Sequence, residues 1–173
     1  MPIHVKVVLI GDAMIYHVLD QSDADFPHLF KVLADFDSYL PRSAKSFELY
    51  ARVFTRMATD ELMPAFSAAA VAELCEHGAR IAAAHDKLTA RFGRLGDLAR
   101  EAAFLARKQA GDAETVVSGE HVREAVRRTK RRADLPARRF REQVSLGRIC
   151  VCTKGSRVGQ INGLAVMSAG PLN

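Results

Sequence analysis

The sequence has little cysteine and no long apolar run. Its three cysteines make an odd number, and Cys75 is distant in sequence from Cys150 and Cys152, so we expect reduced thiols in a cytoplasmic protein rather than a disulfide framework. The apolar residues never run to eighteen in a row, which excludes a membrane-spanning helix. The first residues show neither a basic segment before an apolar run nor a small-residue cleavage site, and we expect no signal peptide.

The motifs of a complete nucleotide-hydrolysing or proteolytic site are also missing. The sequence contains no G-x-x-x-x-G-K-[ST] phosphate loop and no predicted strand that ends in paired acidic residues able to hold Mg²⁺. No nucleophilic serine with a desolvated lysine base is recognisable, because Ser156 and Lys154 lie in a predicted turn, where a solvated lysine keeps its proton. Cys150 and Cys152 lack the second ligand pair of a structural zinc site. We therefore predict no catalytic residue and no metal ligand.

What is present suffices for a folded domain. The chain has 173 residues, of which 49% are apolar and 26% charged, which suits one compact domain, or one domain with a short appendage. The net charge of +5 conceals an asymmetry, since residues 1–86 carry a net charge of −5 and residues 87–173 one of +10. The second half is a candidate surface for an anionic partner such as a nucleotide, a nucleic acid or an acidic protein face. For any single basic residue, a solvated helical surface is the alternative.

Short β-type runs stand near both ends. Residues 3–10 (IHVKVVLI) are largely apolar on both faces, which predicts a strand buried on two sides of a sheet. The next strand-like segment is residues 31–36, and two strands cannot make a sheet covered on both faces. A period of two over residues 148–152 and 158–166 predicts a lone β-hairpin, which is marginal in water. We therefore expect an internal fragment whose partner strands precede and follow it.

Between these runs the periodicity is helical. Two short helical stretches are expected over residues 13–19 and 23–30. Four longer amphipathic helices follow, three of them after a capping serine (Ser43, Ser67 and Ser118), over residues 44–59, 68–88, 92–109 and 119–131. Pro136 lies in the first turn of a last helix that ends at Gly147. The predicted fold class is mainly α: a helical bundle with a β-strand remnant at the N-terminus and a β-hairpin at the C-terminus.

The order of these segments resembles the Lon-like ATP-dependent proteases, in which an AAA+ ATPase precedes a serine–lysine protease domain. Residues 77–102 (HGARIAAAHDKLTARFGRLGDLAREA) resemble the lid subdomain of that family, and residues 120–128 (EHVREAVRR) resemble the lid helix that follows. Residues 158–166 (VGQINGLAV) look like the opening strand of the Lon protease domain. The joint order of the three segments is more specific than any one of them.

The resemblance implies four parts. Residues 1–40 would be the C-terminal remnant of the AAA+ α/β core, residues 41–133 the helical lid, residues 134–147 a connecting helix, and residues 148–173 the start of the protease domain. The parent protein would be a cytoplasmic hexamer that binds ATP and Mg²⁺, takes unfolded protein substrates and cleaves them by acyl-enzyme chemistry on serine, with no membrane involved. The chain itself would hydrolyse neither ATP nor peptides and would hold no cofactor. Its expected part is mechanical: the lid closes over nucleotide and transmits the nucleotide state to the protease ring.

Two positions are implied at the nucleotide. Asp12 follows the core strand at the place of the polar sensor; because a carboxylate beside phosphate is electrostatically unfavourable, it could instead orient a water or the metal. Arg91 matches the lid arginine that senses the γ-phosphate, with Arg94 as the alternative. A planar guanidinium can bridge phosphate oxygens and so link nucleotide state to lid angle. The structural alternative is that Arg91 lies on the bundle surface or pairs with Asp97 or Glu101.

The basic stretch from Arg123 to Arg141 supports a second hypothesis. It contains nine lysines and arginines, and clustered cations can release counterions from a nucleic-acid backbone. The alternative function is therefore a free-standing basic helical module that binds nucleic acid, DNA included. Against it, Phe140 is the one aromatic residue of the stretch, and no docking motif is recognisable. Under the Lon-like hypothesis the same cations would line the lid face or the junction with the protease ring.

Overall fold

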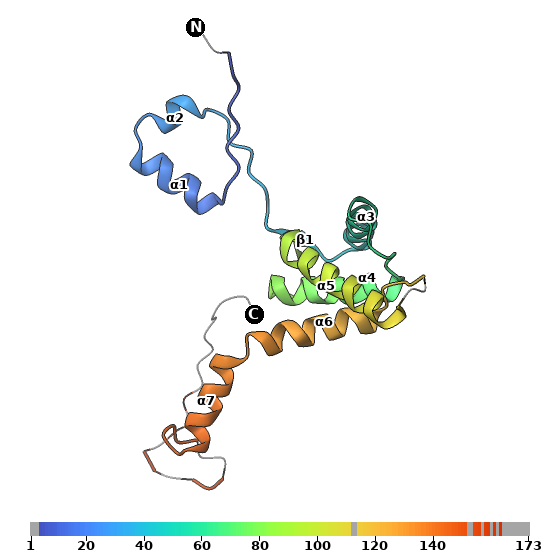
Figure 1. The fold of residues 1–173 in the computed structure, drawn as a ribbon. Helices are drawn as coiled ribbons and strands as arrows, with labels where there is room; N and C mark the ends of the chain where they lie inside the picture. Colours follow the sequence, from blue (N-terminus) through green and yellow to red (C-terminus); the bar gives the residue numbers. More distant parts are fainter. Residues whose placement is uncertain are drawn as a thin grey trace. The chain divides into compact units, whose positions relative to one another are not determined.

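The structure is a computed structural model that describes residues 4–111, 114–151, 154–156, 158–159, 161 and 163. The chain divides into two compact units, Met1–Asp37 and Ser38–Asn173, whose elements are labelled in Figure 1. The described residues form seven helices and one two-stranded antiparallel sheet. This confirms the prediction of a mainly α fold. None of the described helices has the length and apolar character needed to cross a bilayer.

The first unit contains two short helices, α1 (Ala13–Ser22) and α2 (Phe26–Leu29). α1 begins after Asp12, whose Oδ1 accepts a hydrogen bond of 2.9 Å from the backbone N–H two residues further on, as an N-cap aspartate does. Phe26 is the one buried residue among those described in this unit. Its ring centroid lies 5.5 Å from that of Tyr16 and 5.1 Å from that of Phe30, so a small aromatic cluster joins the two helices.

The strands predicted in this unit are not formed. Residues 4–10 and 31–36 lie in no strand, and the side chain of Ile10 is 97% exposed. A strand is stable only where its backbone N–H and C=O groups pair with a neighbouring strand, and none of the described residues pairs with either segment in a sheet. The predicted β-strand remnant at the N-terminus was in this respect wrong: apolar, β-branched residues alone do not make a strand.

The second unit is a helical bundle. Its main helices are α3 (Ala44–Asp60), α4 (Ala68–Ala82), α5 (Phe92–Ala110) and α6 (Gly119–Arg132). The hydroxyls of Ser43, Ser67 and Ser118 each accept a hydrogen bond from the backbone N–H three residues further on, which confirms all three predicted N-caps. The largest fully buried side chains of the core are those of Tyr50, Phe54, Leu74, Leu88, Leu95, Val117 and Val122.

α6 packs against both α4 and α5 (Figure 1). A short parallel bridge between Phe66 and Val117 aligns the starts of α4 and α6: the N–H of Ser67 donates to the Val117 carbonyl at 2.9 Å, and the N–H of Val117 donates to the Ala65 carbonyl at 2.8 Å. Because α4 and α6 begin next to the two residues of this bridge, the two helices run close together. A Cβ added at Gly119 would lie 3.2 Å from the carbonyl oxygen of α4 that faces it, so a glycine permits this approach.

The helix predicted over residues 68–88 ends earlier than expected. Ala83 adopts a left-handed conformation (φ 53°) that closes α4, and the chain continues into strand β2 (Lys87–Thr89). β2 pairs antiparallel with β1 (Tyr39–Pro41), with Leu88 opposite Leu40. Leu88 is fully buried, and this tertiary pairing overrides the local helical pattern.

The last helix, α7 (Leu135–Ser145), buries none of its residues. The predicted hairpin follows it. Its first arm was predicted over residues 148–152, but residues 148–151 lie in no strand, because they have no sheet to join. The second arm, residues 158–166, lies mostly outside the described residues, so the hairpin stays a prediction.

Candidate functional site

A recess of about 310 Å³ opens where α4, α5 and α6 meet. Its residues come from the last turns of α4, the first half of α5 and the last turns of α6. They are His77, Arg80 and Ile81; Arg94, Asp97, Leu98 and Glu101; and Val126, Thr129, Lys130 and Arg132. They come together because α6 packs against both α4 and α5, which also contact each other. The recess combines an apolar part, formed by Ile81, Leu98 and Val126, with charged groups.

The charge balance of the recess is positive. Its two carboxylates are already engaged by arginines: Glu101 accepts hydrogen bonds from the guanidinium of Arg132, and Asp97 accepts one of 2.9 Å from Arg100. The three other cations, Arg80, Arg94 and Lys130, form no ion pair with any described residue. Three helices therefore each contribute one uncompensated positive charge to the same recess.

His77 lies half-buried among these cations. Burial lowers the pKa of its imidazole, and Arg80, Lys130 and Arg94 lower it further, because each of them disfavours a second positive charge. Its Nδ1 atom is buried and has no hydrogen-bond partner among the described residues. A buried polar atom without a partner is unfavourable. The recess thus presents three exposed cations around an imidazole whose Nδ1 is shielded from solvent.

The sequence-predicted sensor residues lie in different places. Arg91 is the N-cap residue of α5; its backbone N–H donates to the Thr89 hydroxyl at 3.1 Å, and its exposed side chain forms no ion pair with any described residue. Of the structural alternative, the position of Arg91 on the bundle surface is observed, whereas pairing with Asp97 or Glu101 is not. Arg94 lies one turn further along α5 and lines the recess, whereas Arg91 does not.

Asp12 belongs to the first unit, where its carboxylate caps α1. This local role was not among the expectations, although an aspartate before an apolar helical run is a common N-cap signal. One carboxylate oxygen is occupied by the cap. The other forms no hydrogen bond with a described residue.

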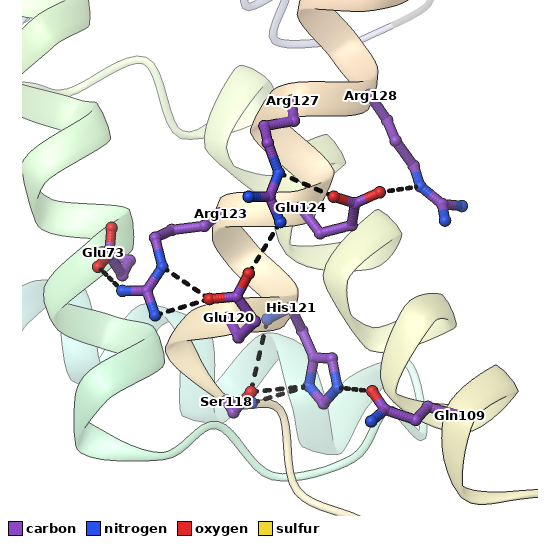
Figure 2. A network of polar contacts seen from close by, with 9 residues as sticks. All are labelled: Glu73, Gln109, Ser118, Glu120, His121, Arg123, Glu124, Arg127 and Arg128. Carbon is purple, nitrogen blue, oxygen red and sulfur yellow. Dashed lines mark hydrogen bonds and ion pairs between the residues drawn. The ribbon is translucent and has the colours of Figure 1, made fainter.

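Most cations of the basic stretch are bound to carboxylates, and Figure 2 shows this for Arg123, Arg127 and Arg128. Arg123 contacts Glu73 of α4 as well as Glu120, Arg127 bridges Glu120 and Glu124, and Arg128 donates to Glu124. Further along, Arg132 pairs with Glu101, and Arg138 and Arg141 pair with Asp134. Six of the nine cations therefore have a carboxylate within 4 Å, which reduces the field that they present to an anionic polymer.

His121 is a structural residue that sequence reasoning missed. The Ser118 backbone N–H donates to His121 Nδ1 at 3.1 Å, and the His121 backbone N–H donates to the Ser118 hydroxyl (Figure 2). This is a capping box with histidine in the place of the usual glutamate or glutamine. Because Nδ1 accepts, Nε2 carries the proton and donates to Gln109 Oε1 at 2.8 Å. The spacing of a serine three residues before a hydrogen-bonding side chain is the signal that could have identified it.

No metal centre is found in the part of the chain that the structure describes, where no three His, Cys, Asp or Glu side chains gather. Cys75 is buried in the bundle, and burial raises the pKa of its thiol to about 11. Cys150 is exposed, and Cys152 lies outside the described residues. The described residues therefore contain no site shared by Cys150 and Cys152, the two cysteines that are close in sequence.

Two family models match the chain. Residues 65–132 match the AAA+ ATPase lid domain of archaeal LonB, and residues 1–37 match the AAA domain of LonB-like proteins. The first match covers α4, α5 and α6, which contain the recess. Comparison with curated proteins gave no match.

Proposed function

Because this chain belongs to the LonB-like AAA+ family, we propose that it works in an ATP-dependent serine endopeptidase, as the lid that senses nucleotide and the link to the protease ring. In this proposal residues 1–40 end the AAA+ core, residues 41–133 form the lid, residues 134–147 connect, and residues 148–173 begin the protease domain. The protein would act in the cytoplasm as a hexamer on unfolded protein substrates.

The proposal rests on the exposure and the pairing of the Arg91 side chain. Its guanidinium is exposed and unpaired among the described residues, while its backbone is held by Thr89, which is buried at the end of β2. β2 is in turn fastened to α3, because the Tyr50 hydroxyl donates to the Thr89 carbonyl. A phosphate bound by the Arg91 side chain would therefore act on a backbone segment that is bonded to the rest of the bundle.

ATP supplies the negative charge of its γ-phosphate when it is bound, and the residues present fit such a group. Arg91 can donate two parallel hydrogen bonds to phosphate oxygens. Loss of those bonds after hydrolysis would release the arginine and change the lid angle. Asp12 has a smaller part in the proposal: with one oxygen capping α1, its second oxygen is left to orient a water or a water bound to Mg²⁺.

The proposal is tested in the ring-forming protease that carries this chain. We expect Arg91→Gln to lower ATP-dependent degradation of an unfolded substrate by about tenfold or more, because one charge-assisted contact is lost. Arg131→Gln is the matched control, since Arg131 is also exposed and has no ion pair among the described residues. Loss of activity in Arg94→Gln alone would assign the sensor to Arg94. Full ATP-dependent degradation by both Arg91→Gln and Arg94→Gln would refute nucleotide sensing by the start of α5.

A further inference from the structure

We propose that the recess between α4, α5 and α6 binds a small phosphate-class oligoanion, such as pyrophosphate or the phosphate tail of a nucleotide. The site would use Arg80, Lys130 and His77 together with Arg94, and it does not include Arg91. The inference goes beyond the proposed function, with which it shares Arg94, the alternative sensor; it rests on the recess of the helical unit and is tested through Arg80 and Lys130.

The cations of the recess differ in their pairing from most arginines of α6. Of the arginines of α6, all but Arg131 find carboxylates, at distances of 2.5–2.8 Å. Arg80, Arg94 and Lys130 do not, although Asp97 and Glu101 line the same recess, because these carboxylates are bound to Arg100 and Arg132. Like charges that converge without a counter-charge repel one another. An anion in the recess would relieve that repulsion and receive three charge-assisted contacts.

His77 lines the same recess as the three cations. Burial lowers the pKa of its imidazole, and each of the three cations lowers it further. Nδ1 of His77 is buried without a partner among the described residues. If the imidazole turned so that this nitrogen reached the recess, a phosphate oxygen could accept a hydrogen bond from Nδ1–H of the neutral ring and so satisfy the atom.

The recess is small and two of its walls are tied together. Glu101 of α5 is bound by Arg132 and by the hydroxyl of Thr129, both on α6. The third wall, α4, also packs against α6. The volume of about 310 Å³ is at the lower end of small-molecule sites, which favours a compact anion over a polymer.

The test is a calorimetric titration of the whole chain with pyrophosphate at constant ionic strength. We expect saturable binding of one pyrophosphate, and a movement of the His77 ring signals in NMR spectra that His121 does not share. Arg80→Gln combined with Lys130→Gln should weaken binding by about tenfold or more. The control is Arg131→Gln combined with Arg139→Gln, which removes the same charge at two exposed cations outside the recess and without ion pairs among the described residues. It should change binding less than twofold.

Thermal melting confirms that both double variants are folded, and Lys130→Gln alone provides a milder variant that should weaken binding severalfold. Equal weakening in both double variants would show a general charge effect and overturn the proposal, as would the absence of saturable pyrophosphate binding. A second titration uses ATP. Competition between ATP and pyrophosphate identifies the phosphate tail of a nucleotide as a ligand of the recess, whereas binding of pyrophosphate alone identifies a free oligoanion. Neither result depends on Arg91→Gln, so this proposal and the proposed function can fail separately.

Discussion

Gly78 of α4 faces Tyr50 of α3 at close range, and this approach predicts a large effect for a very small substitution. A Cβ built at Gly78 would lie 2.7 Å from the Tyr50 hydroxyl oxygen, 3.0 Å from Cε1 and 3.2 Å from Cζ. Carbon atoms in contact are normally separated by about 3.5–4.0 Å. Gly78→Ala therefore requires either the tyrosine ring or the helix to move.

The ring has little freedom to move. Tyr50 is fully buried, and its hydroxyl donates to the Thr89 carbonyl. Overpacking of a well-packed core costs about 1–3 kcal/mol, and loss of the hydroxyl's hydrogen bond would add about 1 kcal/mol. Alanine recovers about 1 kcal/mol through its higher helix propensity. The net expectation for Gly78→Ala is a destabilisation of about 1–3 kcal/mol.

Gly93→Ala is the matched control. Gly93 also lies in a helix, but a Cβ built there meets nothing within 4 Å. The same substitution should stabilise the protein there by up to about 1 kcal/mol. Urea denaturation followed by circular dichroism measures both free energies of unfolding. If Gly78→Ala were as stable as Gly93→Ala, the close packing of α3 on α4 would be refuted.

A double variant tests the cause. Tyr50→Phe removes the hydroxyl oxygen, which is the atom nearest to the added Cβ. Gly78→Ala should then cost about 1 kcal/mol less in the Tyr50→Phe background than in the wild type, because the closest clash is gone while the contacts to Cε1 and Cζ remain. Strictly additive free energies would assign the cost of Gly78→Ala to another contact.

Further predictions concern the caps and one ion pair. Ala83→Gly should stabilise the protein by about 0.5–1 kcal/mol, because Ala83 adopts φ 53°; Ala72→Gly, in the exposed interior of α4, should instead destabilise it by about 1 kcal/mol in the same urea assay. His121→Ala should cost about 1 kcal/mol through loss of the capping box, whereas His121→Gln should retain most of that stability. The hydrogen bond from Arg132 lowers the pKa of Glu101, so the stabilisation by this carboxylate is present above its unfolded-state pKa and is lost as the pH falls through the folded-state value. The melting temperature of the wild type should therefore fall more between pH 6 and pH 3 than that of Glu101→Gln, and equal slopes would contradict this assignment.

The helical part of the fold was predictable because its signals are local. Each of the helices that follow Ser43, Ser67 and Ser118 combines a capping hydroxyl with an apolar periodicity, and each begins where the sequence indicates. The end of α5 was predictable for the same reason: Gly111 has a positive φ of 64°, which glycine adopts readily. No partner element elsewhere in the chain is needed to specify these boundaries.

The β structure was not predictable, because strands depend on partners. Residues 4–10 have the composition of a buried strand and pair with no described residue. Leu88, in contrast, continues an apolar helical pattern but lies in β2, where pairing with β1 buries it. The decisive event is the left-handed Ala83, which has no local sequence signal because alanine ordinarily favours a helix.

The recess was beyond sequence reasoning for a geometric reason. His77, Arg94 and Lys130 are separated by many residues along the chain and come together only because α4, α5 and α6 pack against one another. Arg94 was identified through the resemblance to the Lon-like family, but nothing in the sequence indicated that it shares a recess with Arg80. The sequence does not show which cations line a common recess and which pair with carboxylates, because both depend on the positions of side chains from different helices.

The same distinction limits the nucleic-acid hypothesis. Of the nine cations from Arg123 to Arg141, only Lys130, Arg131 and Arg139 form no ion pair with a described residue. For a duplex, the slope of log K against log salt is about −0.9 for each phosphate neutralised. Nine available cations would give a slope of about −8, whereas three give about −3. We therefore expect fluorescence anisotropy with labelled duplex DNA to show weak binding, with a slope no steeper than about −3; a slope near −8 would mean that phosphates displace the carboxylates of α6, and the basic stretch would then be a nucleic-acid surface after all.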